Sequence, residues 1–366
     1  MSRIVVAMSG GVDSTLAAAL LHEQGHETIG VTLRLHPCEG SGQARSCCGG
    51  DSVAQARAVA GQLGIPHHVL DCQDLFADEV LRPAWDDYRN GRTPNPCVLC
   101  NARLKFGALL EFARTLGAER VATGHYARLL PGADPAAAPV LHRGADRAKD
   151  QSYFLFALDP GQRRAACFPL GGLEKCEVRR LARERGLVTA DRAESQDICL
   201  AGDAEGFASL LAAQFAGGAT RPGHFVDETG RVLGAHRGVE SFTIGQRRGL
   251  GVALGAPAWV SEIRAGTAEV VLTTREEALL AGGLEADGMV WQAVPPEAGA
   301  AVPCEVQTRY RQRPTPASVV RRADGSACVH FLRPVKAVTP GQAAVLYQGD
   351  RVLGGGWIRR SLPLPS

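Results

Sequence analysis

Short apolar runs alternate with helix-forming stretches over residues 3–126, and this alternation constrains the fold more than any other feature of the sequence. Four runs read as strands: residues 3–8, 29–34, 67–71 and 121–126. Two stretches between them, 14–24 and 51–63, have helical periodicity, and Gly25 is placed to end the first. The sequence therefore predicts an α/β fold with a Rossmann-like parallel sheet, which binds ligands beyond the carboxyl ends of its strands.

The pattern changes after about residue 205, where helical periodicity fades and short β runs separated by turn residues follow one another. These runs are residues 223–226, 231–233, 302–308, 327–332, 343–347 and 352–358. Strands at this spacing are typical of a small barrel or sandwich. With 366 residues, we expect three domains: an α/β domain over 1–205, a small central domain over 206–280 and a C-terminal β-barrel over 281–366.

Composition excludes several classes of protein. No stretch approaches the roughly 20 apolar residues of a membrane span, and the chain enters its first predicted strand without a signal peptide, so we expect a cytoplasmic protein with no membrane partner. Its 11 cysteines are too few for a disulfide scaffold, which leaves catalytic, redox or metal-binding roles. A net charge of +2 neither indicates nor excludes a nucleic-acid partner.

The hexapeptide SGGVDS at residues 9–14 lies between the first predicted strand and the first predicted helix. Backbone N–H groups and the positive end of the helix converge there, which favours a bound anion. The two glycines let a phosphate approach the chain, the two serines offer hydroxyl donors, and Asp13 can hold Mg²⁺. The Gly-Lys-Ser/Thr ending of a Walker A loop is missing. The sequence therefore predicts a phosphate-binding loop that is not a Walker A loop.

Cys97 and Cys100 form a C-x-x-C pair, and Cys199 stands about a hundred residues further on. We expect Asn101 to cap a helix that begins beside the pair, which would lower the pKa of the thiols. Taken alone, the pair is also compatible with half of a zinc site or with buried thiols. Five other cysteines are expected to be small buried apolar residues: Cys72, Cys167, Cys176, Cys304 and Cys328.

The loop at residues 9–14 resembles the pyrophosphate (PP) loop of the N-type ATP pyrophosphatases, which cleave ATP between its α and β phosphates. Together with TPNPCVLCN at 93–101 and SQDIC at 195–199, it makes the chain resemble one family of that class, the tRNA-specific 2-thiouridylases. Further matching segments are residues 122–126, 149–154, 243–251, 309–310 and 337–342. The resemblance implies an ATP pyrophosphatase catalytic domain, a central domain that contacts tRNA, and an enzyme that replaces the 2-oxo oxygen of the wobble uridine by sulfur.

The resemblance also implies a role for particular residues. Cys199 would carry sulfur as a persulfide received from a relay protein or a cysteine desulfurase, and Cys100 would attack or resolve it, leaving a disulfide to be reduced. The residues implied to bind ATP are Ala7, Met8, Ser9, Gly10, Gly11, Val12, Asp13, Ser14, Leu33 and Gly124. Those implied to bind tRNA are Asn95, Pro96, Cys97, His125, Lys149, Asp150, Gln151, Arg309, Tyr310 and Gln342.

One position departs from the family pattern. The better-known members have an aspartate, assigned an acid/base role, where this sequence has Cys97. With Cys100 and Cys199 this makes three thiols, which could hold a [4Fe-4S] cluster by three irons. The alternatives are a persulfide route without metal, a zinc site, and a Cys97 without a role.

Lysine is rare in the chain: only Lys105, Lys149, Lys175 and Lys336 stand among 40 basic residues. A lysine is therefore more informative here than an arginine. Two other functions stay open from the residues themselves: another adenylating ligase or amidotransferase with a PP-loop, and a redox- or metal-responsive RNA-binding protein. Formation of AMP that depends on tRNA separates the three functions.

Overall fold

The computed structural model describes residues 1–36, 50–132, 134–192, 204–217, 220–252 and 254–365. The chain forms two compact units, each assembled from separate stretches. The first unit comprises Met1–Val80, Cys97–Ala201 and Asp350–Val352. The second comprises Leu81–Pro96, Gly202–Gly349 and Leu353–Ser366. The three predicted domain ranges stay a prediction.

A five-stranded parallel sheet in the order β3-β2-β1-β4-β7 lies at the centre of the first unit. Its strands are β1 (Arg3–Ala7), β2 (Glu27–Arg34), β3 (His67–Asp71), β4 (Arg120–Ala122) and β7 (Ala166–Cys167). The predicted fold class is confirmed. Strands β1, β2 and β3 lie within two residues of their predicted bounds, whereas β4 ends at Ala122, four residues before the predicted end. The two-residue strand β7 is too short to show a pattern of its own, and the sequence did not reveal it.

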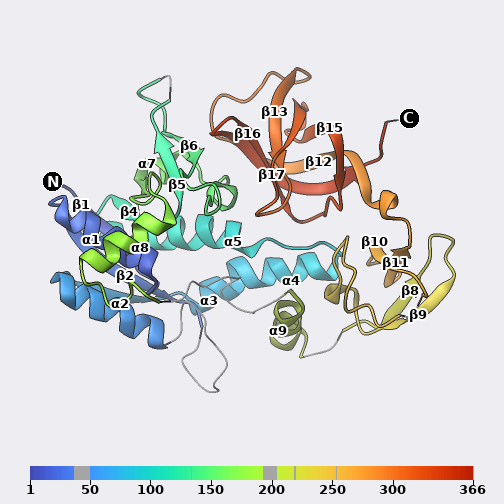
Figure 1. Cartoon of the computed structure of the whole chain (residues 1–366), viewed down its shortest axis with the longest axis horizontal. Helices are drawn as coiled ribbons and strands as arrows, with labels where there is room; N and C mark the ends of the chain where they lie inside the picture. Colours follow the sequence, from blue (N-terminus) through green and yellow to red (C-terminus); the bar gives the residue numbers. More distant parts are fainter. Residues whose placement is uncertain (37–49, 133, 193–203, 218–219, 253, 366) are drawn as a thin grey trace. The chain divides into compact units, whose positions relative to one another are not determined.

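Helices α1 (Val12–Glu23), α2 (Gly50–Leu63) and α8 (Lys175–Glu184) lie beside one another next to β1 and β2 (Figure 1). Their apolar side chains share one core with Ile4, Val6 and Met8, which alternate along β1 and its end and therefore face the same side of the sheet. Gly25 has φ +81°, so α1 ends with the left-handed residue that the sequence predicted. Two further short helices of this unit are α3 (Gln73–Phe76) and α7 (Pro160–Ala165).

One helical run carries the C-x-x-C pair. It consists of α5 (Pro96–Leu99), a π-helix (Cys100–Ala108) and α6 (Leu109–Thr115). Asn101 lies inside this run, and its side-chain amide donates a hydrogen bond to the carbonyl of Phe154 at 3.1 Å. The prediction that Asn101 caps the helix is therefore wrong, because the helical run begins earlier, at Pro96.

A hairpin of β5 (Ala127–Leu130) and β6 (Val140–Arg143) also belongs to the first unit. Its strands pair in antiparallel register, and residues 131–139 connect them. Arg128 donates to the Asp350 carboxylate at 2.8 Å, which ties the hairpin to a distant part of the chain. Sequence patterns missed both strands because each has only four residues.

The second unit contains a four-stranded sheet in the order β10-β11-β8-β9. Its strands are β8 (Gly223–Val226), β9 (Val232–His236), β10 (Trp259–Arg264) and β11 (Glu269–Thr273). A core that includes Phe225, Val260 and Leu272 lies against it. Helices α4 (Arg82–Arg89) and α9 (Ala204–Ala216) pack through Tyr88 and Phe207, whose ring centroids are 6.2 Å apart.

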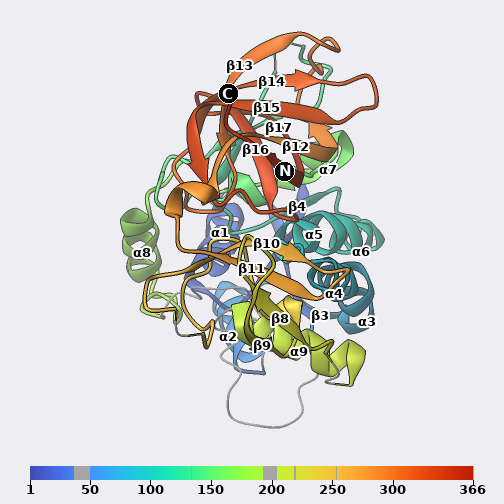
Figure 2. The same cartoon turned by 90° about the vertical axis from the view of Figure 1, so that its right-hand side faces the viewer.

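Six further strands of this unit run in the order β12-β15-β14-β13-β16-β17, and β12 also pairs with β17, which closes a barrel (Figure 2). Their bounds are β12 (Leu280–Trp291), β13 (Ala301–Gln307), β14 (Thr315–Arg321), β15 (Ala327–Lys336), β16 (Ala343–Gln348) and β17 (Arg351–Leu362). The predicted C-terminal barrel is thus confirmed, although β12 and β14 were not among the predicted strands. In the part of the chain described, no helix is both long and apolar enough to cross a membrane.

Candidate functional site

The glycine loop follows β1 and opens α1, as the sequence predicted. Gly10 has φ +71°, and a Cβ built on it would lie 2.3 Å from the carbonyl oxygen of Ser52, so only glycine fits there. The Ser14 hydroxyl accepts a hydrogen bond from the Ser9 N–H at 3.1 Å and donates one to the Gly11 carbonyl at 3.1 Å. Ser14 therefore shapes the loop from within.

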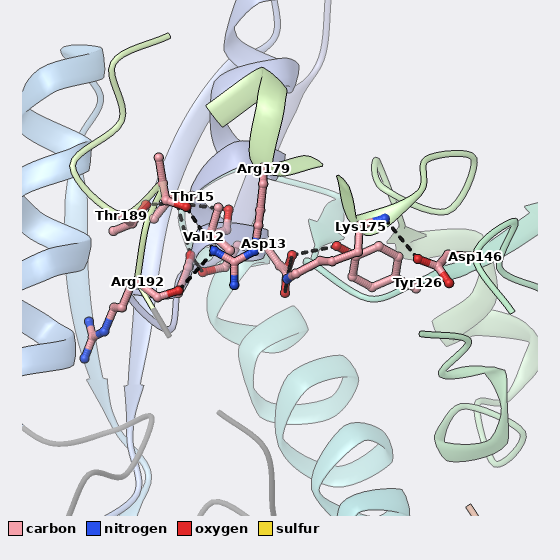
Figure 3. Close-up of polar contacts among 12 residues, drawn as sticks. Val12, Asp13, Thr15, Tyr126, Asp146, Lys175, Arg179, Thr189 and Arg192 are labelled. Atoms are coloured by element: carbon pink, nitrogen blue, oxygen red, sulfur yellow. Dashed lines mark hydrogen bonds and ion pairs between the residues drawn. The ribbon is translucent and has the colours of Figure 1, made fainter. Parts of the chain in front are cut away.

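Asp13 lies in the first turn of α1 and is the centre of a polar cluster (Figure 3). The Lys175 ammonium donates to both of its carboxylate oxygens, at 2.6 and 2.7 Å, and the Tyr126 hydroxyl donates to one of them at 2.7 Å. Lys175 is the first residue of α8. Sequence reasoning assigned no role to Lys175 or Tyr126, although the rarity of lysine was a signal that could have found the former.

A second set of contacts holds residues 187–192 against the loop (Figure 3). The hydroxyls of Thr15 and Thr189 are 2.6 Å apart, and the Arg192 guanidinium donates to the Gly10 carbonyl at 3.0 Å. Arg179 donates to two backbone carbonyls of the same segment. Beyond Arg192 the chain leads to Cys199, which lies outside the described residues, so the predicted place of Cys199 stays a prediction.

The carboxyl ends of β2 and β4 carry the two strand-end residues that the sequence singled out. A Cβ on Gly124 would lie 2.8 Å from the carbonyl carbon of Asp13 and from the nitrogen of Ser14, so this residue touches the loop backbone directly. Leu33 is buried near the end of the neighbouring strand β2. Met8 donates its N–H to Val31 of β2 at 2.8 Å, which fixes the base of the loop.

Cys97 and Cys100 are both half-buried, the first in α5 and the second at the start of the π-helix. Burial raises the pKa of the Cys100 thiol, and the charge of Lys105 opposes this to a smaller extent. The expected lowered pKa is therefore wrong for Cys100, because desolvation outweighs the effect of the nearby cation. Since a π-helix bonds residue i to i+5, Cys100 and Lys105 stand about one turn apart.

His125 links the cysteine helix to the loop region. Its imidazole Nδ1 lies 2.7 Å from the Thr123 hydroxyl, and its ring lies 6.4 Å from that of Phe106, on the helix that carries Cys100. Burial, with a smaller effect of Lys105, holds the pKa of His125 well below its usual value, so the ring is neutral at pH 7. The residue before it, Gly124, contacts the glycine loop.

The segment Lys149 to Gln151, predicted to bind tRNA, is engaged within the protein. The Asp150 carboxylate accepts hydrogen bonds from the N–H groups of Gly144 and Ser152 at 2.9 and 3.1 Å, and burial raises the pKa of Asp150. Gln151 exchanges hydrogen bonds with the backbone of Tyr126, at 3.1 Å through its side chain and at 2.9 Å through its N–H. These contacts position Tyr126, a partner of Asp13.

Two residues of the second unit that were predicted to bind tRNA also have structural partners. The Arg309 guanidinium donates to the carbonyls of Ile244 and Ala337, both at 2.9 Å, and to the Thr339 hydroxyl at 2.6 Å. Its neighbour Tyr310 lies under the guanidinium of the following arginine, whose central carbon is 5.5 Å from the ring centroid. Arg309 thus joins segments far apart in the sequence.

Gln342 holds the segment that precedes the C-x-x-C pair. Its side-chain amide donates to the carbonyls of Thr93 and Pro94, at 3.1 and 2.9 Å, and the Thr93 N–H donates to Pro340 at 2.9 Å. The buried Asn95 and Pro96 follow directly in the chain. Gln342 is therefore placed to position two residues predicted to bind tRNA.

The other predicted cysteine environments are partly right. Cys72, Cys304 and Cys328 are buried, and Cys167 is half-buried, but Cys176 is exposed because it is the second residue of α8 and its side chain is directed away from the core. Within the described ranges, which leave out Cys199, no group of three or more His, Cys, Asp or Glu side chains is arranged to hold a metal ion.

The parallel sheet and the glycine loop between its first strand and first helix define the first unit as an N-type ATP pyrophosphatase fold. Residues 2–203 match the family described as tRNA methyl transferase HUP domain. Residues 216–274 match the tRNA methyl transferase PRC-barrel domain, and residues 281–358 match the aminomethyltransferase beta-barrel domain.

Curated relatives match over almost the whole chain. A protein of Rhodospirillum centenum named tRNA-specific 2-thiouridylase MnmA is 45% identical over 377 residues, covering 100% of this chain and 93% of its own. The protein of that name from Geobacter metallireducens is 46% identical over 364 residues, covering 97% of this chain and 96% of its own. The chain belongs to the tRNA-specific 2-thiouridylase family.

Two solved structures are similar to about half of the chain. A 4-thiouridine synthetase in complex with RNA and ATP is 18% identical, with a TM-score of 0.35, and the match covers 54% of this chain and 44% of that one. An NMN synthetase from Francisella tularensis is 18% identical with a TM-score of 0.33, covering 53% of this chain and 66% of that one.

Proposed function

We propose that this enzyme uses ATP to thiolate C2 of the wobble uridine of tRNA. The observation that carries the proposal is family membership over the full chain, since relatives named tRNA-specific 2-thiouridylase match at 45–46% identity. The glycine loop at residues 9–14 supports it, because its sharp turn and the helix behind it suit the phosphates of ATP. The wobble base must leave its stack to reach the site.

Activation by ATP answers a chemical need. The carbonyl at C2 of uridine is a poor electrophile, and its oxygen is a poor leaving group. Attack of that oxygen on the α phosphate of ATP forms an O–P bond and releases pyrophosphate. The oxygen then leaves as part of AMP when sulfur attacks C2. The loop and Lys175 would bind the negatively charged phosphates, and a bound Mg²⁺ would neutralise further charge, with Asp13 as its protein ligand.

Sulfur is then transferred from Cys199 to C2 of the uridine, and Cys100 releases it from Cys199. Cys199 carries a persulfide, whose outer sulfur attacks C2 as AMP departs. Cys100 then attacks the sulfur of Cys199, so the S–S bond to the transferred sulfur breaks and a Cys100–Cys199 disulfide forms. An external thiol reductant supplies two electrons to restore both thiols. Because burial raises the pKa of Cys100, its proton must be removed when it attacks, and the positive charge of Lys105 favours that step.

Cys97 gives this chain a second possible sulfur chemistry. With Cys100 and Cys199 it offers three soft ligands that would hold a [4Fe-4S] cluster, which would supply an iron site for the sulfur. Without a cluster, the Cys97 thiol would be the proton-transferring group at the position where better-known family members have an aspartate. We propose the persulfide route with a relay protein or cysteine desulfurase as donor and tRNA as substrate, in the cytoplasm.

Two measurements test the function and the sulfur route. Purified enzyme with ATP, unmodified tRNA and a persulfide donor should form AMP and pyrophosphate only when tRNA is present; AMP formed with a small molecule and no tRNA would instead indicate another adenylating ligase. Iron and sulfide analysis after anaerobic purification should find neither in fully active enzyme. Stoichiometric iron that is lost together with activity in Cys97→Ser would replace the persulfide route by the cluster route.

A further inference from the structure

The Asp13 carboxylate is held by a cation of the protein itself. The Lys175 ammonium bridges both carboxylate oxygens, at 2.6 and 2.7 Å, in the way that a bound metal ion would. The pair is well shielded on the lysine side, where the side chain is 10% exposed, whereas Asp13 is 32% exposed. Asp13 is therefore partly open to solvent, whereas Lys175 is almost closed off from it.

Two contacts place the lysine in addition to its ion pair with Asp13. Its backbone N–H donates to the Asp146 carboxylate at 2.9 Å, at the start of α8. Its Nζ lies 5.6 Å from the ring centroid of Tyr126, a distance typical of a cation–π contact. The hydroxyl of the same tyrosine donates to Asp13, so Tyr126 guides both members of the ion pair.

The negative charge of Asp13 lies in a loop that is expected to bind phosphate, and Lys175 neutralises this charge. The loop is built for phosphate, yet it carries a carboxylate in the first turn of the helix and has no lysine of its own. A carboxylate beside a triphosphate is repelled unless a cation lies between them. The chain supplies that cation from α8, 162 residues beyond Asp13.

We propose that Asp13 exchanges partners when nucleotide binds. Lys175 neutralises Asp13 as long as no nucleotide is bound. When a triphosphate arrives with its divalent cation, Asp13 binds the cation and the Lys175 ammonium turns to the phosphate oxygens. Lys175 is then a phosphate ligand that the loop sequence lacks, and it competes with divalent cations for Asp13 until nucleotide is present. This inference rests on the proposed ATP-dependent function.

Binding measurements without tRNA test the exchange separately from thiolation. Free Mn²⁺ measured by electron paramagnetic resonance gives the affinity of nucleotide-free enzyme for Mn²⁺, and calorimetry gives ATP affinity in EDTA. Lys175→Met should bind Mn²⁺ about threefold or more tighter, because the competitor is gone. It should bind metal-free ATP about tenfold or more weakly, because a charged hydrogen-bond donor is lost. The gain for Mn²⁺ should vanish in the Asp13→Asn, Lys175→Met double variant.

Lys336→Met is the matched control, since Lys336 lies in the barrel and pairs with exposed Glu276. It should leave both affinities unchanged. If Lys175→Met binds Mn²⁺ no tighter than wild type, or if the gain persists without the Asp13 carboxylate, the exchange is refuted even when the enzyme thiolates tRNA normally. If tRNA is not thiolated but the two affinities change in opposite directions, only the proposed function fails.

A measurement on the wild-type chain covers the case in which Lys175→Met does not fold. Acetylation of lysines by a water-soluble reagent, mapped by mass spectrometry, reports how strongly each ammonium is held. Millimolar Mn²⁺ without nucleotide should speed acetylation of Lys175 and leave Lys336 unchanged, because the metal releases the first from Asp13. An unchanged rate at Lys175 with Mn²⁺ bound would overturn the exchange.

Discussion

Replacing Gly124 by alanine should disturb the nucleotide loop without touching any polar side chain. The added Cβ would lie 2.8 Å from the carbonyl carbon of Asp13 and the nitrogen of Ser14, both backbone atoms that cannot rotate away. To reach an ordinary contact of about 3.5 Å, the loop or β4 must retreat by about 0.7 Å. Overpacking of this kind costs about 1–3 kcal/mol. Displacement of the phosphate-binding groups should weaken ATP binding by about tenfold or more.

Calorimetric titration with ATP in the presence of Mg²⁺ measures this effect directly. Gly61→Ala is the matched control: Gly61 lies inside α2, and a Cβ there would meet no atom within 4 Å. That variant should bind ATP like wild type and gain about 0.5–1 kcal/mol in stability, because alanine favours a helix interior over glycine. If Gly124→Ala binds ATP as tightly as Gly61→Ala does, the close contact between Gly124 and the loop does not organise the ATP site.

Three further changes test other parts of the molecule. Arg360 and Arg322 lower the pKa of Glu285 from 4.5 to about 2, so the stability that this carboxylate contributes is complete above pH 4.5 and lost as the pH falls towards 2. Acid unfolding followed by circular dichroism should therefore depend less on pH in Glu285→Gln, and identical profiles would contradict this. Arg309→Met should lower the free energy of unfolding in urea by about 1–3 kcal/mol, because three acceptors lose their donor; weaker tRNA binding at unchanged stability would favour a phosphate contact instead. Gln342→Leu should slow thiolation while ATP affinity stays unchanged, and normal kinetics would show that its bonds to the backbone before the cysteines are dispensable.

The sequence predicted the parallel sheet well because its strands and helices carry strong local signals. Strand β3 begins at His67 and ends at Asp71, as predicted, and Gly25 ends α1 as expected. Strands such as β5, β6 and β7 were missed, since two to four residues hold too few side chains to show a period. Strand β7 forms by pairing with β4, whereas β5 and β6 pair with each other and are tied by Arg128 to the distant Asp350.

The candidate site was predictable as a set of motifs but not as a set of contacts. The glycine loop and Gly124 meet because strand ends of a parallel sheet share one edge. The ion pair between Asp13 and Lys175 depends on where α8 packs, which no local pattern encodes. Burial likewise decided the direction of the pKa shift of Cys100, and burial of a single thiol follows from the whole fold.

The most direct test of the account is the modification state of tRNA in cells that lack this protein. Mass spectrometry of nucleosides from the anticodon loop measures the sulfur at C2 of the wobble uridine. We expect 2-thiouridine to disappear from that position and to return when the wild-type gene is restored, but not with Cys100→Ser or Cys199→Ser. Intact 2-thiouridine at the wobble position in the deletion strain would contradict the proposed function.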